Sequence, residues 1–304
     1  MAITRRGILK TLGGALLGAF GFAGYGFAIE PGWRLVTTRY RIRPEGWPEG
    51  MRLKIALIAD VHASEPQMGL KRIADVVAMT NALKPDIILL LGDYGIGQKI
   101  YARPIDPMAL VPVLSGLEAP LGKFGILGNH DYWGGSLRDW PYTPKKVHDY
   151  AQHYRDMLAG AGITLLENDV RRLSTADGRP FWLVGTGSMI ALPLGHRRFT
   201  SYADLDSQLP RLTDDAPALL MAHEPDLFRK VPKRIALTMS GHTHGGQVRL
   251  FGFSPVTPSD YGNRYAYGHV LEDGRNLVVS GGLGTSMLPV RFGVPPEVVL
   301  VELG

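Results

Sequence analysis

The sequence predicts an α/β domain, and three observations support this fold class. Short runs of Val, Ile and Leu recur along the chain, and each is followed by a polar or glycine-rich turn. The runs are continuously apolar and too short for helices, so they predict buried strands. Segments with helical periodicity stand between some of the runs. No internal repeat or linker divides residues 31–304, so we expect a single domain over that range.

The expected elements follow one another in a simple order. The first two strands flank the segment 69–84, whose apolar residues recur near the helical period, so a β-α-β unit opens the domain. A second helix is expected at 143–162, because Gly160 and Gly162 there are typical of a helix end. The runs that predict strands lie at 53–60, 86–93, 123–131, 180–187, 217–226, 234–244, 276–282 and 297–303.

The first 30 residues are expected to be a targeting segment. Arg5 and Arg6 precede 19 uncharged, mostly apolar residues at 11–29, a pattern typical of an export signal, and the arginine pair resembles the twin-arginine type. The alternative is a membrane anchor, because about 20 apolar residues can span a bilayer. No clean A-x-A cleavage site precedes Glu30, so removal of the segment stays open. In both cases we expect residues 31–304 outside the cytoplasm, in the periplasm or at the membrane, after transport by the twin-arginine machinery.

Composition excludes several kinds of site. Three of the 33 basic residues lie within the first ten positions, and the other 30 are nearly balanced by 28 acidic residues, so no nucleic-acid partner is indicated. The chain has no cysteine, which excludes disulfides, thiolate metal sites and a cysteine nucleophile. Any metal ion would therefore be bound by imidazole, carboxylate or amide groups.

Metal-binding types of side chain follow five of the expected strands. In sheets of this kind, ligands bind where the carboxyl ends of strands open into loops. Five of the nine histidines stand at such exits. The other four are expected to be surface or packing residues: His148, His153, His196 and His269. The candidate site residues are Asp60, His62, Asp93, Asn129, His130, Asp131, His223, His242 and His244.

These motifs resemble those of the calcineurin-like metallophosphoesterases. DVH at 60–62, GD at 92–93, GNHD at 128–131, His223 and GHTH at 241–244 stand in the family order. The sequence from GHTHGGQVRLFG to GLGTSMLPVRFGVPPEVVLVEL further resembles the exported bacterial branch, which includes lipid-active and cell-wall-associated phosphodiesterases. The resemblance implies a four-layer α/β/β/α sandwich of two mixed sheets flanked by helices, and a metal-dependent phosphoric ester hydrolase.

The resemblance also implies two divalent metal ions, which the ligand types would allow to be manganese, iron or zinc. A carboxylate shared between the two ions would screen their mutual repulsion, and the pair could activate a bridging hydroxide and hold the phosphate. The family assignment places Asp60, His62 and His244 on one ion, Asn129, His223 and His242 on the other, and Asp93 on both.

His130 resembles the catalytic histidine of the family. The resemblance implies that it donates a hydrogen bond or proton to the phosphoryl or leaving-group oxygen, while Asp131 holds its tautomer and orientation. A contact that only supports the structure is the alternative for His130. We expect direct attack by the metal-bridging hydroxide, without a covalent phosphoenzyme.

The chain departs from the exported branch at two places. That branch often has an arginine in the pattern SRGLGT, where residues 280–285 read SGGLGT, so Arg291 is a speculative substitute for binding phosphate. Residues 185–188 read GTGS, where related sequences often have acidic residues. Neither change affects an expected metal ligand.

Two segments bear on the substrate. Residues 132–142 place Tyr132, Trp133, Trp140 and Tyr142 after the GNHD motif, and residues 188–199 combine apolar side chains with Arg197 and Arg198. Aromatic and basic residues near the site would suit a phospholipid or envelope phosphate ester. The alternative is that the loops pack on their own domain. Hydrolysis of nucleotides or other small soluble phosphates, and a non-catalytic metal-stabilised binding module, are the other functions considered.

Overall fold

The structure is a computed structural model that describes residues 4, 13–14, 18, 20–95, 97–98, 100, 102–133, 143–195 and 198–304. Its first large sheet is mixed. The strands β2, β4, β6 and β7 run parallel, and β16 runs antiparallel to β2. The strand order across this sheet is β1 (Val36–Ile42), β16 (Glu297–Leu303), β2 (Leu53–Ile58), β4 (Ile87–Leu90), β6 (Lys123–Gly125) and β7 (Thr164–Leu165).

The second large sheet is also mixed. Its four central strands run parallel, and the two edge strands β14 and β8 run antiparallel to their neighbours. Two short ribbons accompany the sheets, β3 (Ser64–Glu65) with β5 (Arg103–Pro104) and β10 (Leu192–Gly195) with β11 (Arg198–Thr200). The order in the second sheet is β14 (Gly268–Glu272), β15 (Arg275–Val279), β13 (Ile235–Ser240), β12 (Ala218–Met221), β9 (Pro180–Gly185) and β8 (Asp169–Ser174).

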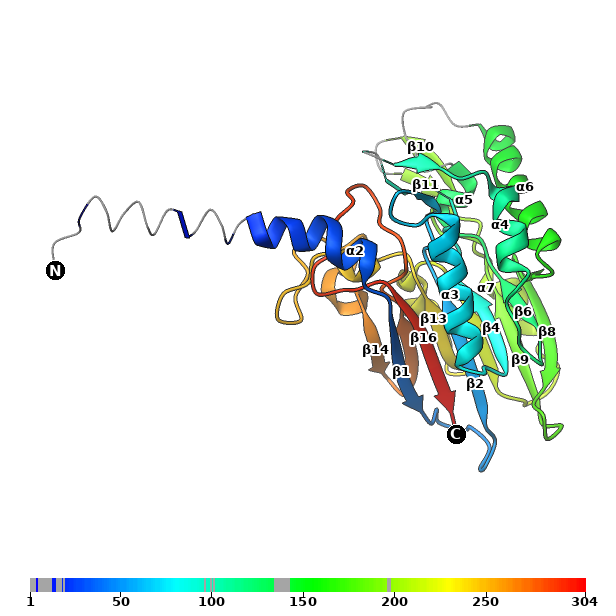
Figure 1. Cartoon of the computed structure of the whole chain (residues 1–304). Helices are drawn as coiled ribbons and strands as arrows, with labels where there is room; N and C mark the ends of the chain where they lie inside the picture. Colours follow the sequence, from blue (N-terminus) through cyan, green and yellow to red (C-terminus); the bar gives the residue numbers. More distant parts are fainter. Residues whose placement is uncertain are drawn as a thin grey trace.

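Helices cover the outer faces of both sheets. The long helices α3 (Leu70–Ala82), α4 (Pro107–Leu114) and α6 (Pro144–Gly160) lie side by side over the first sheet (Figure 1). The outer face of the second sheet is covered by shorter elements, namely α7 (Leu205–Gln208), η3 (Leu209–Arg211), η4 (Pro225–Lys230) and η6 (Gly262–Tyr265). The remaining short helices are η1 (Tyr25–Ile29), α2 (Glu30–Trp33), α5 (Asn129–Trp133) and η5 (His244–Gly246).

The main core lies between the two sheets. In β4, Ile87 and Leu89 pack into this core, whereas Ile88 and Leu90 pack against the helices on the other face. A strand that is buried on both faces needs apolar residues at every position, which explains its continuous apolar sequence. The predicted four-layer arrangement of two mixed sheets flanked by helices is confirmed.

All eight expected strands and both expected helices are present, and the elements that the sequence did not predict include the four edge strands of the two large sheets. The strands β8 and β14 border the second sheet. In β8 two arginines are exposed, and in β14 exposed residues alternate with half-buried ones, so neither strand has a continuous apolar run. The helix α4 is almost wholly apolar and contains Pro112, so it shows no helical periodicity. Asp106 caps it by accepting a hydrogen bond from the Met108 amide at 2.9 Å.

The end of the N-terminal segment packs against the loop before β16. The ring of Phe22 stacks on Phe292 with centroids 4.1 Å apart, and the Gly26 carbonyl accepts the Arg291 amide at 2.9 Å. The buried Glu30 carboxylate accepts the Val294 amide at 2.8 Å. All three contacts join the expected N-terminal segment, residues 1–30, to the domain expected at 31–304. Arg5 and Arg6 lie outside the described residues.

No helix in the described parts of the chain is both long enough and apolar enough to cross a membrane.

Replacing Leu183 with alanine tests the core between the sheets. Leu183 is fully buried in β9, so we expect Leu183→Ala to lower the free energy of unfolding by about 2–5 kcal/mol, measured by urea denaturation. The matched control is Leu271→Ala, whose side chain on β14 is 67% exposed and should cost little. Equal losses for the two variants would contradict the assigned core.

Candidate metal centre

The nine candidate residues meet at one end of the two sheets. They stand on the loops that follow β2, β4, β6, β12 and β13, as the strand exits predicted. Eight of them are buried, and His242 is half-buried. Burying so many ionisable groups is costly unless each group has a partner, so the contacts among them matter.

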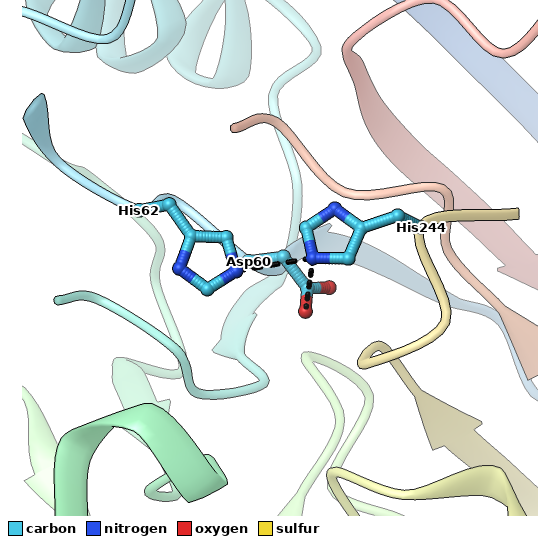
Figure 2. A group of neighbouring side chains, drawn as sticks. All are labelled: Asp60, His62 and His244. Atoms are coloured by element: carbon cyan, nitrogen blue, oxygen red, sulfur yellow. Dashed lines mark hydrogen bonds and ion pairs between the residues drawn. The ribbon is translucent and has the colours of Figure 1, made fainter. Parts of the chain in front are cut away.

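The first cluster joins Asp60, His62 and His244 (Figure 2). The Nε2 atoms of the two imidazoles lie 3.0 Å apart, and His244 Nε2 lies 3.6 Å from an Asp60 carboxylate oxygen. His62 Nδ1 lies 2.7 Å from the Gly95 carbonyl oxygen. A carbonyl can only accept, so Nδ1 carries the proton and Nε2 keeps a lone pair directed into the cluster.

The second cluster joins Asp93, His223 and His242, with Asn129 beside it. His223 Nδ1 lies 2.7 Å from the Leu91 carbonyl oxygen, so the same reasoning leaves its Nε2 free to bind a cation. His242 Nδ1 lies 2.9 Å from the Asn129 side-chain oxygen. The amide oxygen and the two imidazoles thus converge on one place.

Asp93 connects the two clusters. One oxygen of its carboxylate lies 3.6 Å from His62 Nε2 and 3.2 Å from His223 Nε2. The other oxygen accepts the backbone amide of His130 at 2.8 Å. A carboxylate that faces both clusters has the position required of a ligand shared by two cations.

The backbone at the site is strained. Five of the seven expected ligands have a positive φ, a region that residues other than glycine rarely occupy. Each such residue costs about 1–3 kcal/mol, and strain of this kind gathers at functional sites. The unusual backbone turns these side chains toward a common centre. The residues are Asp60 at 52°, His62 at 44°, Asp93 at 57°, His242 at 68° and His244 at 52°.

Two glycines leave room for the carboxylates. A Cβ on Gly128 would lie 2.2 Å from an Asp93 carboxylate oxygen, and a Cβ on Gly282 would lie 2.6 Å from the Asp60 Cβ. Gly282 also has a φ of +70°. Any other residue at either position would displace a ligand.

The electrostatics favour neutral imidazoles in three positions. Burial lowers the pKa of His62, lowers that of His242 to about 4, and holds that of His244 well below its usual range with help from His62 and Arg291. A neutral imidazole is the form that binds a metal ion.

His223 and Asp93 form an ion pair. Burial lowers the pKa of His223, but the adjacent Asp93 carboxylate more than offsets this and raises it well above the usual value. Burial likewise raises the pKa of Asp93, but the charge of His223 overrides it and keeps that carboxyl ionised. The proton shared by His223 and Asp93 balances the charge of the carboxylate, and a metal cation bound to both side chains would replace it.

Asp131 binds backbone amides around the site, and its role in orienting the His130 imidazole stays a prediction. Its carboxylate accepts four backbone amides, those of Asp93 at 2.8 Å, Tyr94 at 2.8 Å, Gly95 at 3.2 Å and Gly128 at 2.9 Å. Asp131 therefore fixes the loop that carries Asp93.

Trp133 packs against His130 and helps to hold its ring. Its ring stacks on the imidazole of His130 with centroids 5.0 Å apart, and the His62 ring lies edge-on at 4.9 Å on another side. The Trp133 indole donates a hydrogen bond to the Ile190 carbonyl at 3.2 Å. Glu224 holds that segment by accepting the Met189 amide at 2.9 Å. The spacing of His130 and Trp133 by three residues fits the short helix α5, which the sequence did not predict.

Arg291 is buried behind His244 and is not accessible to a substrate. Its guanidinium is fully buried and donates to the carbonyls of Gly281 at 2.8 Å, Gly284 at 3.0 Å and Val294 at 2.9 Å. One of its nitrogens lies 3.3 Å from His244 Nδ1. Burial lowers its pKa to about 10, which still leaves it cationic at neutral pH. The speculation that it binds phosphate in place of a missing arginine is therefore wrong.

The expected aromatic residues have different positions. Tyr132 is fully buried and donates to Glu167, so it does not lie at the mouth of the site. Arg198 is exposed on β11, while Trp140, Tyr142 and Arg197 lie outside the described residues.

Three of the four other histidines are surface or packing residues, as predicted. His148 and His153 are exposed on α6, and His269 pairs with Asn276 at 3.0 Å. His196 lies outside the described residues.

The donor set fits a pair of divalent cations. In each cluster the ligand atoms lie within 4.8 Å of one another, and backbone carbonyls hold two of the imidazoles in the metal-binding tautomer. Carboxylate, amide oxygen and imidazole are borderline-hard ligands that suit manganese, iron or zinc. His130 also lies within 4.8 Å of one member of each cluster, His62 and Asp93, so it stands at the edge of the two clusters.

Sequence comparison relates the chain to a known protein family. The family model described as calcineurin-like phosphoesterase matches residues 53–273. The uncharacterized metallophosphoesterase YkuE of Bacillus subtilis is 32% identical over 99% of this chain and 98% of its own length. The phosphodiesterase YaeI of Escherichia coli is 32% identical over 99% of both chains. Among solved structures, the phosphopantetheinyl hydrolase PptH of Mycobacterium tuberculosis aligns with a TM-score of 0.41 and 15% identity, over 76% of this chain and 90% of its own.

Asp93→Asn tests the shared ligand. The amide keeps the shape of the side chain but loses the charge that faces both clusters, so we expect bound metal to fall from two ions per chain to one or fewer. Metal content would be measured by plasma mass spectrometry after loading and gel filtration. The control is Asp149→Asn, on the exposed face of α6, which should retain both ions. Two tightly held ions in both variants would contradict a bridging role for Asp93.

Proposed function

The chain belongs to the calcineurin-like phosphoesterase family and is a metal-dependent phosphoester hydrolase, and from this premise we propose that it acts on lipid or cell-envelope phosphates outside the cytoplasm. The proposed hydrolysis with two metal ions is supported mainly by the position of Asp93 between two clusters of metal-binding side chains. The substrate and location are supported by the N-terminal sequence, where Arg5 and Arg6 precede the apolar stretch.

The site residues divide into two ligand sets that share one carboxylate. When bound, the two ions would supply Lewis acidity, which neutralises phosphoryl oxygens and lowers the pKa of water. The negative charge of Asp93 would reduce the repulsion between the ions, and the carbonyls of Gly95 and Leu91 keep their imidazole partners in the binding tautomer. The first ion would be held by Asp60, His62, Asp93 and His244, and the second by Asp93, Asn129, His223 and His242.

His130 is the proposed acid of the reaction. Its amide is fixed to Asp93 and its ring is held by Trp133, so the imidazole has a defined position at the rim of the clusters. From there it can donate a hydrogen bond or proton to a phosphoryl or leaving-group oxygen. Because the two ion sites provide for activation of water, no side-chain nucleophile is required, and we infer that no covalent phosphoenzyme forms.

A phosphodiester is the favoured bond type. The Escherichia coli relative, which matches this chain over nearly its whole length, is called a phosphodiesterase. A phosphodiester carries one negative charge and presents two ester oxygens, so one can leave with a proton from His130 while the other stays bonded.

The N-terminal segment is proposed to stay attached as an anchor. Removing residues 1–30 would take away the Glu30 carboxylate that accepts the Val294 amide and the Gly26 carbonyl that accepts the Arg291 amide. Each buried amide left without a partner costs about 1–3 kcal/mol. The contacts around Arg291 also adjoin His244, so the segment supports the site as well as the fold.

Hydrolysis assays test the catalytic part of this proposal. Metal-stripped protein should regain turnover of bis-p-nitrophenyl phosphate when manganese, iron or zinc is added, with a lower rate on p-nitrophenyl phosphate. His130→Gln should keep both ions yet lose about 10²–10⁴-fold in kcat, because it cannot transfer the proton. His153→Gln, on the exposed face of α6, is the matched control. Full activity in His130→Gln would show that this imidazole only supports the loop.

A substrate panel tests the lipid part. The full chain should hydrolyse a phospholipid in mixed micelles faster than a cyclic nucleotide at equal concentration, because apolar side chains such as those of the segment 188–199 would bind the lipid tail and add nothing for a soluble ester. Rates would be followed by phosphate or alcohol release at several micelle concentrations. Equal rates on the two substrates, or a faster rate on the nucleotide, would favour small soluble phosphates as the substrate class.

A further inference from the structure

Exposed apolar side chains gather on three segments of the chain. They lie on the helical residues 20–29, which we call the N-terminal helix, on the loop 250–256 and on the turn 287–288. Some are almost fully exposed, with Phe20 at 74%, Val256 at 76% and Phe251 beyond the exposure of an extended chain. We call this set the apolar face, and it consists of Phe20, Phe22, Phe27, Leu250, Phe251, Phe253, Val256, Met287 and Leu288.

Contacts of Phe292 and Gln247 link the three segments. The Phe292 ring stacks on Phe22 at 4.1 Å, while the Phe292 carbonyl accepts the Arg249 amide at 2.8 Å next to the loop 250–256. Gln247 donates to the Leu288 carbonyl at 3.2 Å. The N-terminal helix leaves the domain on the side where the loops before β14 and β16 lie (Figure 1). The three segments that carry the apolar face are therefore adjacent, although they are far apart in sequence.

The loop 250–256 exposes its aromatic residues to solvent on a strained backbone. Leu250 and Phe253 pair across a tight turn, in which Phe251 has a φ of 51° and Gly252 a φ of 81°. A bulky residue with positive φ is a marked outlier, and here its side chain points into solvent and gains no packing in return. Single exposed apolar residues are common, but a connected group of this size marks a contact surface.

We propose that the apolar face docks on a lipid bilayer. Residues 11–29 form an uncharged, mostly apolar stretch preceded by Arg5, Arg6 and Lys10, and its described end is part of this face. None of the ranges 11–29, 245–259 and 281–296 contains an acidic residue, which suits an anionic membrane surface. Phenylalanine, leucine and valine at the tips of loops are residues that insert at the headgroup boundary.

Docking would bring the metal centre close to the lipid headgroups. The Met287 amide donates to the Gly97 carbonyl at 2.9 Å, and Gly97 lies so close to the His62 ring that a Cβ there would come within 2.7 Å of it. The face therefore adjoins the loop that packs on a metal ligand. This inference goes beyond the proposed function, because docking does not require the substrate to be a lipid.

Site-directed spin labelling tests the docking directly. The chain has no cysteine, so Phe251→Cys in the full chain gives a single labelling site, and Leu271→Cys on β14 is the matched exposed control. The N-terminal stretch could bind a membrane by itself, so a label on the loop is needed to report on the face. Collisions with oxygen and with a water-soluble nickel chelate would be measured with and without vesicles of phosphatidylethanolamine and phosphatidylglycerol.

We expect vesicles to lower the nickel collisions of the label at 251 severalfold and to raise its oxygen collisions, while the label at 271 stays unchanged. Unchanged collisions at 251 in vesicle-bound protein would overturn the proposal. Equal shielding at 251 without vesicles would also overturn it, in favour of a second copy of the chain as the occupant. Turnover of bis-p-nitrophenyl phosphate by the same labelled proteins reports on hydrolysis separately, so docking and catalysis can fail independently.

Discussion

The carboxylate of Asp93 lies between two clusters of imidazoles, and the arrangement of the surrounding loops depends on it. Its two oxygens face His62, His223 and the His130 amide, so a small displacement would disturb both clusters. Asp131 prevents such a displacement by accepting the amides of residues 93, 94, 95 and 128. The acid next to the catalytic candidate thus acts on the backbone of the shared ligand, and Trp133 positions the imidazole of His130.

The fold supplies the rigidity that this arrangement needs. Strands from both sheets end at the same edge of the sandwich, and their side chains are packed on both faces, so the ends of the strands are fixed points. Each ligand stands within a few residues of such an end. The strained backbone of Asp60, His242 and His244 can be maintained because the short loops have little freedom to relax. The packing of the two sheets therefore stabilises the strained backbone of these few residues.

Much of this could be predicted from the sequence, for definite physical reasons. Strands such as β4 are buried on both faces and therefore leave a continuous apolar run, and the residues that follow such runs locate the site. Edge strands such as β8 are largely exposed to solvent and resemble polar loops in sequence. The hydrogen bonds that Asp131 and Arg291 make to backbone groups could not be predicted, because only the tertiary fold brings those groups near. Nothing in the sequence around Arg291 indicated that its side chain would be buried next to His244.

Anomalous diffraction at the zinc edge from crystals of the zinc-loaded protein would show whether the seven side chains hold two cations with Asp93 between them. We expect two peaks, both within about 2.0–2.2 Å of an Asp93 oxygen, with His62 and His244 on one ion and His223 and His242 on the other. A single peak, or two peaks that do not share Asp93, would contradict this arrangement.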